Sequence, residues 1–120
     1  MPSMMATGEK LEGHLGKVPK SQVRTVYTQA EFEEALADSA TLEIHLNSNL
    51  NTVFAITDAH ERSRQVSVRA MGAVQVRVSG GRLIAHDNAH VTAAGNTLLV
   101  LESAQVVYDV SDTVRVIREY

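Results

Sequence analysis

Short runs of alternating apolar residues fill residues 65–109 and return every seven or eight positions. Alternation of this kind predicts β-strands that bury one face. Pairs of turn-forming residues separate the runs: Gly80 and Gly81, Asp87 and Asn88, Gly95 and Asn96, Glu102 and Ser103. Self-similarity at a short period indicates stacked units that cannot bury a core singly. The sequence therefore predicts an all-β fold, a short parallel β-solenoid.

The number of strands in each coil follows from the spacing that brings like residues into line. One such spacing places Ile44 over Val66, Phe54 over Val76 and Leu83 over Val106. This repeat predicts about three coils of three short strands. A shorter coil with only two strands is the competing interpretation, and both versions place Gly, Asn and Asp at corners that need a left-handed backbone.

A short helix is predicted ahead of the strands. Thr28 and Glu31 have the spacing of a capping box, in which each side chain bonds to the backbone near the other. The helix covers about 29–37, and its apolar face would cover the first coil. Strands follow at 41–46 and 52–56.

Other segments depart from the strand rhythm. A turn is expected at 47–49, and residues 57–64 are expected to form a loop. Residues 1–24 show no apolar period and are interpreted as an N-terminal arm, so the helix-capped solenoid covers 25–120.

The strand pattern continues to the last residue, and no segment follows that would cover the final coil. An uncovered apolar end favours pairing with another molecule. We therefore expect self-association, with an oligomer interface at Val114, Val116, Ile117 and Tyr120. The alternative is that Arg118, Glu119 and Tyr120 fold over the end themselves.

Composition narrows the classes of function. The net charge is −3, which gives no basic surface for nucleic acid. The chain has no Cys and no long apolar run, so we expect neither a disulfide nor a membrane segment. The expected location is the cytoplasm at synthesis, with a place in a virion as an alternative, and no cofactor is expected.

Candidate binding residues form a sparse basic set: Arg69, Arg77, Arg82, His90 and Arg115. Such a set would meet an acidic protein partner. His86, Asp87 and His90 have metal-ligand chemistry, but their place around a corner gives no reason for them to converge. The acids Asp87, Glu102 and Asp109 fall at corners, and no catalytic motif is present, so the sequence predicts a non-enzymatic protein.

A resemblance adds to this interpretation. The segments Gln29-Ala-Glu-Phe32, Arg82-Leu-Ile-Ala85-His-Asp87-Asn88 and Asn88-Ala-His-Val91-Thr-Ala93-Ala-Gly95 are similar to small octad-repeat β-helix proteins of actinobacterial bacteriophages. The likeness covers about 28–109 and departs from the plain octad at 98–101 and 105–108, where bulkier residues enter. A more distant likeness is to bactofilins, which are β-helices that polymerise end to end.

These observations together predict a self-associating interaction or assembly protein. The resemblance implies that it is phage-encoded, acts in an infected bacterial host, and binds a virion component or a host protein. The alternatives are a bactofilin-like filament-forming scaffold and a glycan-binding or glycan-cleaving β-helix.

Overall fold

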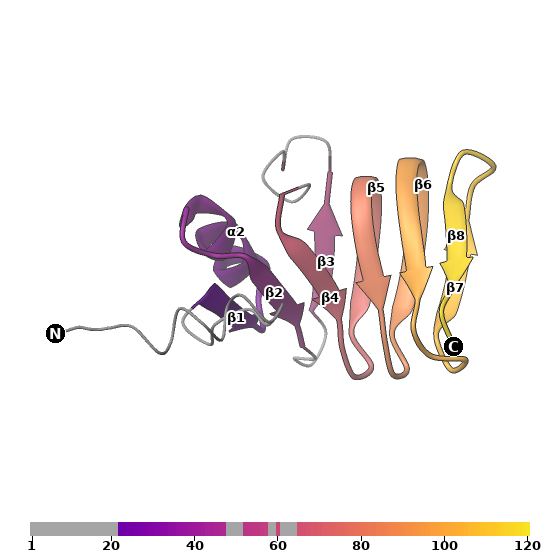
Figure 1. Ribbon diagram of the computed structural model, residues 1–120, viewed down its shortest axis with the longest axis horizontal. Helices are drawn as coiled ribbons and strands as arrows, with labels where there is room; N and C mark the ends of the chain where they lie inside the picture. Colours follow the sequence, from indigo (N-terminus) through magenta and orange to yellow (C-terminus); the bar gives the residue numbers. More distant parts are fainter. Residues whose placement is uncertain (1–21, 48–51, 58–59, 61–64) are drawn as a thin grey trace, which may run out of the picture.

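The structure is a computed structural model that describes residues 22–47, 52–57, 60 and 65–120. One helix lies at one end of a stack of strands, and the C-terminal strands lie at the other (Figure 1). The elements in chain order are β1 Val23–Val26, α2 Gln29–Ala37, β2 Glu43–Leu46, β3 Val53–Ile56, β4 Ser67–Ala70, β5 Gln75–Ala85, β6 His90–Leu101, β7 Val107–Val110 and β8 Arg115–Arg118.

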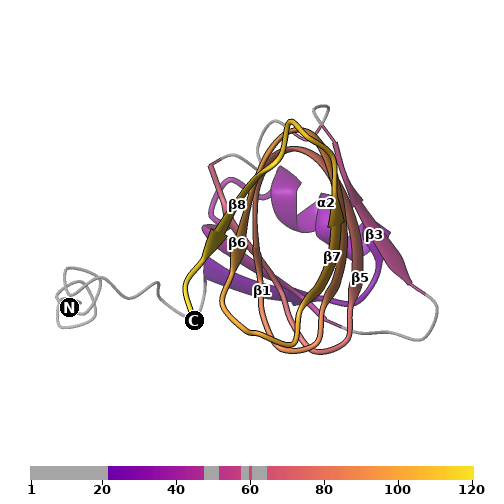
Figure 2. The same cartoon turned by 90° about the vertical axis from the view of Figure 1, so that its right-hand side faces the viewer.

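All strand pairings are parallel, and the chain winds through about five turns, so the predicted β-solenoid is confirmed. Viewed along its axis, the solenoid is a flattened ring with two strand-bearing faces (Figure 2). Face A carries β1, β2, β4, residues 82–85, residues 98–101 and β8. Face B carries β3, residues 75–78, residues 90–93 and β7.

The prediction of three strands in each coil was wrong, and the competing two-strand coil describes the fold. Val76 pairs with Val91, which is the short step that a two-strand coil requires. Phe54 does lie over Val76, as expected, but Ile44 lies over Val68 and Leu83 over Leu99. The expected alignment of Leu83 with Val106 joins residues of opposite faces, because Leu83 lies on face A and Val106 directly precedes β7 on face B.

The inward residues form continuous columns. One column on face A runs from Ile44 through Val68 and on through Leu83 and Leu99 to Val116. All of its members except the last are buried. Burial of aliphatic columns that no single turn can bury alone is the main stabilising contribution to a stack of this kind.

Glycine and aspartate occupy the sharp bends, as predicted. Gly72, Gly80, Gly81 and Gly95 have positive φ angles, and Asp87 reaches φ 53°. At Asp87 the side chain is also used, because its Oδ2 accepts a hydrogen bond from the Gly72 N–H of the preceding turn at 2.9 Å. The bend at Gly95 is also tight, since a Cβ there would lie 3.2 Å from Ser79 Oγ.

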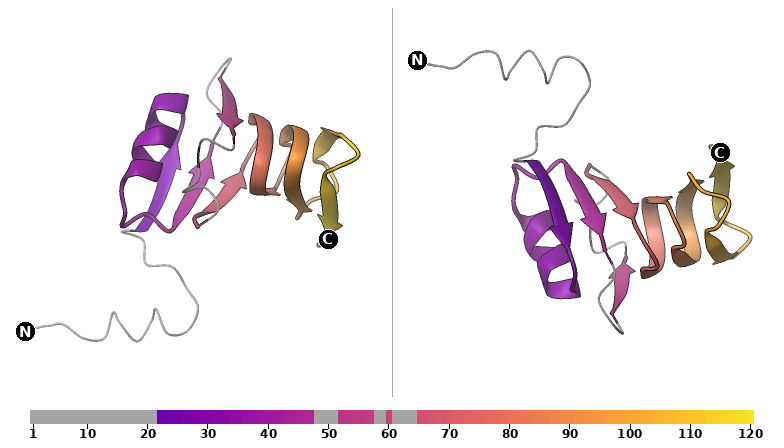
Figure 3. Two further views of the ribbon diagram at one scale, coloured as in Figure 1. Left: turned by 90° about the horizontal axis from the view of Figure 1, so that it is seen from above. Right: turned by 90° about the horizontal axis from the view of Figure 1, so that it is seen from below.

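The predicted helix and strands are confirmed, with one strand added. Strand β1 begins at Val23, so the end of the expected arm belongs to the first turn. Residues 1–21, most of the expected turn at 47–49 and most of the expected loop at 57–64 lie outside the described residues. Seen from above and below, α2 lies beside β1 and β2 at the N-terminal end (Figure 3).

Candidate interaction surfaces

The five basic residues predicted to bind a partner do not form one stripe. Arg69, Arg82 and Arg115 lie on face A, whereas Arg77 and His90 lie on face B. A three-strand coil would place Arg69, His90 and Arg115 on one face. This placement was wrong for His90, because Arg69 pairs with Ile84 on face A whereas His90 pairs with Gln75 on face B.

Arg69 is engaged within the molecule. Its Nη1 donates to Glu102 Oε1 at 2.8 Å, and its Nε lies 3.9 Å from Glu43 Oε2. Glu43 in turn hydrogen bonds with His45 on the same strand. These four side chains are all partly buried, so the cluster is a half-buried ion-pair network on face A. Arg69 is therefore less available to a partner than the other basic residues.

The histidines and acids around the Asp87 corner do not converge. His86 Nε2 lies 3.8 Å from Asp87 Oδ1, but His90 projects outward from β6 on face B. Among the described residues, no group of three His, Asp or Glu side chains is placed to hold a metal ion. The described part of the chain also contains no helix with the length and apolar character needed to cross a membrane.

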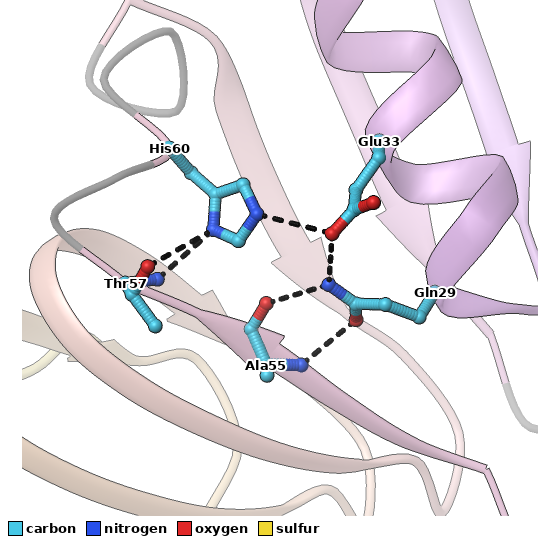
Figure 4. Close-up of polar contacts among 5 residues, drawn as sticks. All are labelled: Gln29, Glu33, Ala55, Thr57 and His60. Atoms are coloured by element: carbon cyan, nitrogen blue, oxygen red, sulfur yellow. Dashed lines mark hydrogen bonds and ion pairs between the residues drawn. The ribbon is translucent and has the colours of Figure 1, made fainter.

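The N-terminal end of face B is closed by the helix. The Gln29 side chain donates to the Ala55 carbonyl at 3.0 Å and accepts from the Ala55 N–H at 2.9 Å (Figure 4). One amide side chain thus takes the two bonds that a neighbouring strand would make with β3. The capping box predicts the helix but not this contact, because nothing in the sequence places Gln29 against β3.

The helix is itself held in place by its cap and by His60. Thr28 Oγ1 accepts from the Glu31 N–H at 3.1 Å, as the capping box predicted, although the Glu31 carboxylate accepts from Tyr27 rather than from Thr28. Phe32 contacts Phe54 and His60 edge to face, with ring centroids 6.4 and 5.6 Å apart.

A hydrogen-bonded chain continues from the helix to His60. Thr57 N–H donates to His60 Nδ1, so the other nitrogen, Nε2, carries the proton that bonds Glu33 at 3.3 Å. The hydrogen bond from Gln29 and the contact with His60 lower the pKa of the Glu33 carboxyl below its ordinary value. Gln29, Glu33 and His60 therefore fasten α2 to the segment that follows β3 (Figure 4).

The C-terminal end of the solenoid is open. Strands β7 and β8 each pair with β6 and, among the described residues, with no strand beyond it. The inward side chains of this last turn pack against the core but are only partly buried: Tyr108, Val110, Val114 and Val116. The last turn thus presents an apolar layer that a further turn would cover.

Some backbone groups at this end also have no strand partner in the described part of the chain. Val107 and Ser111 donate their N–H groups to carbonyls of the preceding turn, and Glu119 donates to Leu101. Successive residues of a strand direct their backbone groups to opposite sides. The residues whose N–H and C=O groups point away from the stack are therefore Tyr108 and Val110 in β7, and Val116 and Arg118 in β8.

The four residues predicted to form an oligomer interface have different positions at this end. Val114 and Val116 are among the half-buried inward residues, while Ile117 projects outward from face A and Tyr120 is 63% exposed. Arg118 continues an inward column below Leu101, and its Nη2 donates to the Tyr108 hydroxyl at 2.7 Å. This bond covers one corner of the open end. The alternative that Arg118, Glu119 and Tyr120 fold over the end is therefore confirmed only for the contact between Arg118 and Tyr108.

Comparisons with known proteins add no relative. We found no family model that matches the chain, and no curated protein or solved structure that is similar to it. The likeness to phage octad-repeat proteins and to bactofilins stays a prediction.

Proposed function

We propose that this protein is a non-enzymatic assembly module that forms a closed pair of two copies through the open end of its solenoid. The observation that carries the proposal is the difference between the two ends. Gln29 and α2 close face B at the N-terminal end, while β7 and β8 leave both an apolar layer and strand edges open. Unpaired edges over an apolar layer favour the addition of further strands.

Two copies meeting through these ends would be related by a two-fold axis, which is the commonest symmetry of homo-oligomers. Because the axis reverses the strand direction, the end strands of the two copies would pair antiparallel. The outward-pointing backbone groups of Val110 and Val116 would bond across the interface. The half-buried valines would then become buried between the two copies.

A filament of the bactofilin kind is the second candidate, and the N-terminal end argues against it. A filament requires the open end of one copy to stack on the N-terminal end of the next. There, β7 of the incoming copy would meet α2 and the Gln29 amide instead of a strand edge. On face A the outer edge of β1 pairs with no described strand, so the block to further stacking lies on face B, and there it favours two copies over a filament.

The glycan-cleaving alternative needs paired acids in a groove, and the three corner acids named for it are separated or engaged. Glu102 bonds Arg69, Asp87 bonds the Gly72 backbone, and Asp109 lies on face B. A macromolecular partner of the pair, either a virion component or a host protein, is the class that the phage resemblance implies.

The test uses sedimentation equilibrium at micromolar concentrations on three forms of the chain. The wild-type mass should fit two copies. Val110→Pro removes an N–H that points away from the stack, so it should give a folded monomer, because proline is tolerated where that group faces solvent. The matched control, Asp109→Pro, removes an N–H that by alternation points to β6, and it should reduce stability instead.

A wild-type chain that stays monomeric across this range would overturn the proposal. A mass that rises without limit would favour the filament. A Val110→Pro variant that keeps its fold and remains paired would show that the copies meet elsewhere.

A further inference from the structure

One feature of the chain has no role in closing either end: the four consecutive aliphatic residues at 98–101. Leu99 and Leu101 point inward and are buried, so Leu98 and Val100 lie on the outer surface of face A. Continuous aliphatic strands are typical of sheets that are covered on both faces. Residues 98–101 therefore have the composition of a strand with a partner on its outer side.

The neighbouring turns extend this surface. Val100 lies between Ile84 and Ile117 in the register of face A, and Leu98 lies between Arg82 and Arg115. Val100 is only 8% exposed although it points outward, while Ile117 is 37% exposed. We call Ile84, Leu98, Val100 and Ile117 the aliphatic patch.

The patch is confined to the later turns. The column that contains Ile84, Val100 and Ile117 continues toward the N-terminal end as Arg69, His45 and Thr25. The change from polar to aliphatic residues within one outward column distinguishes this surface from an ordinary solvated face. It also gives the patch a defined border, at the Arg69–Glu102 ion pair.

The charges around the patch indicate what it binds. Arg82 and Arg115 are exposed and flank Leu98, and neither makes an ion pair or side-chain hydrogen bond with another described residue. At the opposite border, Arg69 is already neutralised by Glu102. A partner that covers Leu98 would thus meet two uncompensated positive charges, which favours carboxylates at its edge.

We propose that the aliphatic patch is the docking site for an acidic amphipathic segment of a partner protein. Its aliphatic side chains would cover the patch, and its carboxylates would pair with Arg82 and Arg115. An anionic membrane fits less well, because the chain has a net charge of −3 and the patch presents only two free arginines among the described residues. The site lies on the side of the solenoid, so it adds a partner to the proposed pair without depending on the open end.

The experiment measures fluorescence anisotropy with three labelled synthetic peptides. One alternates Glu with Leu, the second alternates Lys with Leu, and the third alternates Glu with Ser. The Glu-Leu peptide should bind saturably and at least tenfold more tightly than the other two. Equal binding of the Lys-Leu peptide, or no binding of the Glu-Leu peptide, would overturn the proposal.

Variants locate the binding. The double substitution Arg82→Glu and Arg115→Glu should weaken Glu-Leu binding at least tenfold, and so should Leu98→Gln. The matched controls are on face B: Arg77→Glu is also an exposed arginine, and Val53→Gln replaces a valine that is 41% exposed. The controls should leave binding unchanged. Loss of binding in the controls, or no loss in the patch variants, contradicts the assignment.

Two further measurements test whether a membrane or a second copy of the chain, and not a partner protein, covers the aliphatic patch. Cosedimentation with vesicles of phosphatidylcholine and phosphatidylglycerol should show no binding that depends on Arg82 and Arg115, and such binding would replace the protein partner with a membrane. Sedimentation of the patch variants should give the same mass as the wild-type chain. A lower mass would assign the patch to contacts between copies, whereas the monomeric Val110→Pro variant should still bind the Glu-Leu peptide.

Discussion

Replacing Gln29 tests how the N-terminal end of the solenoid is closed. Gln29→Ala removes both bonds to the Ala55 backbone and the bond to Glu33. Each side-chain bond to the backbone contributes about 0.5–1.5 kcal/mol. Ala55 is half-buried, so water replaces part of what is lost. The better helix propensity of alanine returns at most about 0.5 kcal/mol. The net loss in the free energy of unfolding should therefore be about 1.5 kcal/mol.

Urea denaturation followed by circular dichroism measures this loss. With a slope of about 2 kcal/mol/M, the midpoint should fall by roughly 0.7 M. Glu34→Ala is the matched control, since Glu34 is exposed on the same helix. Its loss should change stability by less than about 0.5 kcal/mol. Gln29→Glu keeps an acceptor for the Ala55 N–H but sets a second carboxylate beside Glu33, so it should be no more stable than Gln29→Ala.

Hydrogen exchange gives a local measurement of the same contact. The Ala55 amide should lose protection in Gln29→Ala by more than the amides of β6. If Gln29→Ala matches Glu34→Ala in stability and leaves Ala55 protected, the amide does not replace a strand and the closure of this end has another cause.

Three further predictions concern the core, a bend and the helix contact. Leu99→Ala should reduce the free energy of unfolding by about 2–5 kcal/mol and Leu98→Ala by about 1 kcal/mol, because only Leu99 is fully buried. Equal losses of unfolding free energy in urea denaturation would contradict the assignment of Leu99 to the interior and Leu98 to the outer surface. Gly95→Ala should cost about 1–2 kcal/mol, because a positive φ strains any residue that has a Cβ. The new Cβ would also crowd Ser79. The control Ala94→Gly should reduce the stability less than Gly95→Ala. A thermal melt in which Ala94→Gly is the less stable of the two variants would refute this strain. The lowered pKa of Glu33 means that its contribution to stability is complete above the ordinary value of 4.5 and is lost as the pH falls below it. Glu33→Gln should therefore flatten the pH dependence of the urea midpoint on the acid side, and an unchanged slope would show that the contact is not formed in solution.

Local patterns were sufficient to predict the elements but not their register. The capping box at Thr28, the strand alternation and the turn glycines each act within a few residues, and the structure has them where they were expected. The number of strands in a coil depends on which residues stack. The long segment after β3 lies in both the step from β2 to β4 and the step from β3 to β5, and it makes them longer than the later steps. These two steps match the longer repeat read from the sequence, but its other alignment, Leu83 with Val106, joins residues of opposite faces.

The candidate surfaces depended on the same register. A three-sided coil places Arg69 and His90 on one face, and the two-sided coil separates them. The aliphatic run at 98–101 was visible in the sequence, but its meaning required knowing that Leu98 and Val100 point outward. The strand β8 was predictable, since the strand alternation continues through residues 113–120.

The most direct test of the closed pair is a distance measurement between its two copies. The chain has no Cys, so a single introduced Cys carries one spin label for each copy. Each turn adds about 4.8 Å along the axis. Across about five turns, labels at Asp112→Cys, beside the open end, should lie within about 30 Å of each other, and labels at Glu34→Cys, on α2, about 50 Å apart or more. Short Glu34 distances, or no distance between copies at either position, would contradict pairing through the open end.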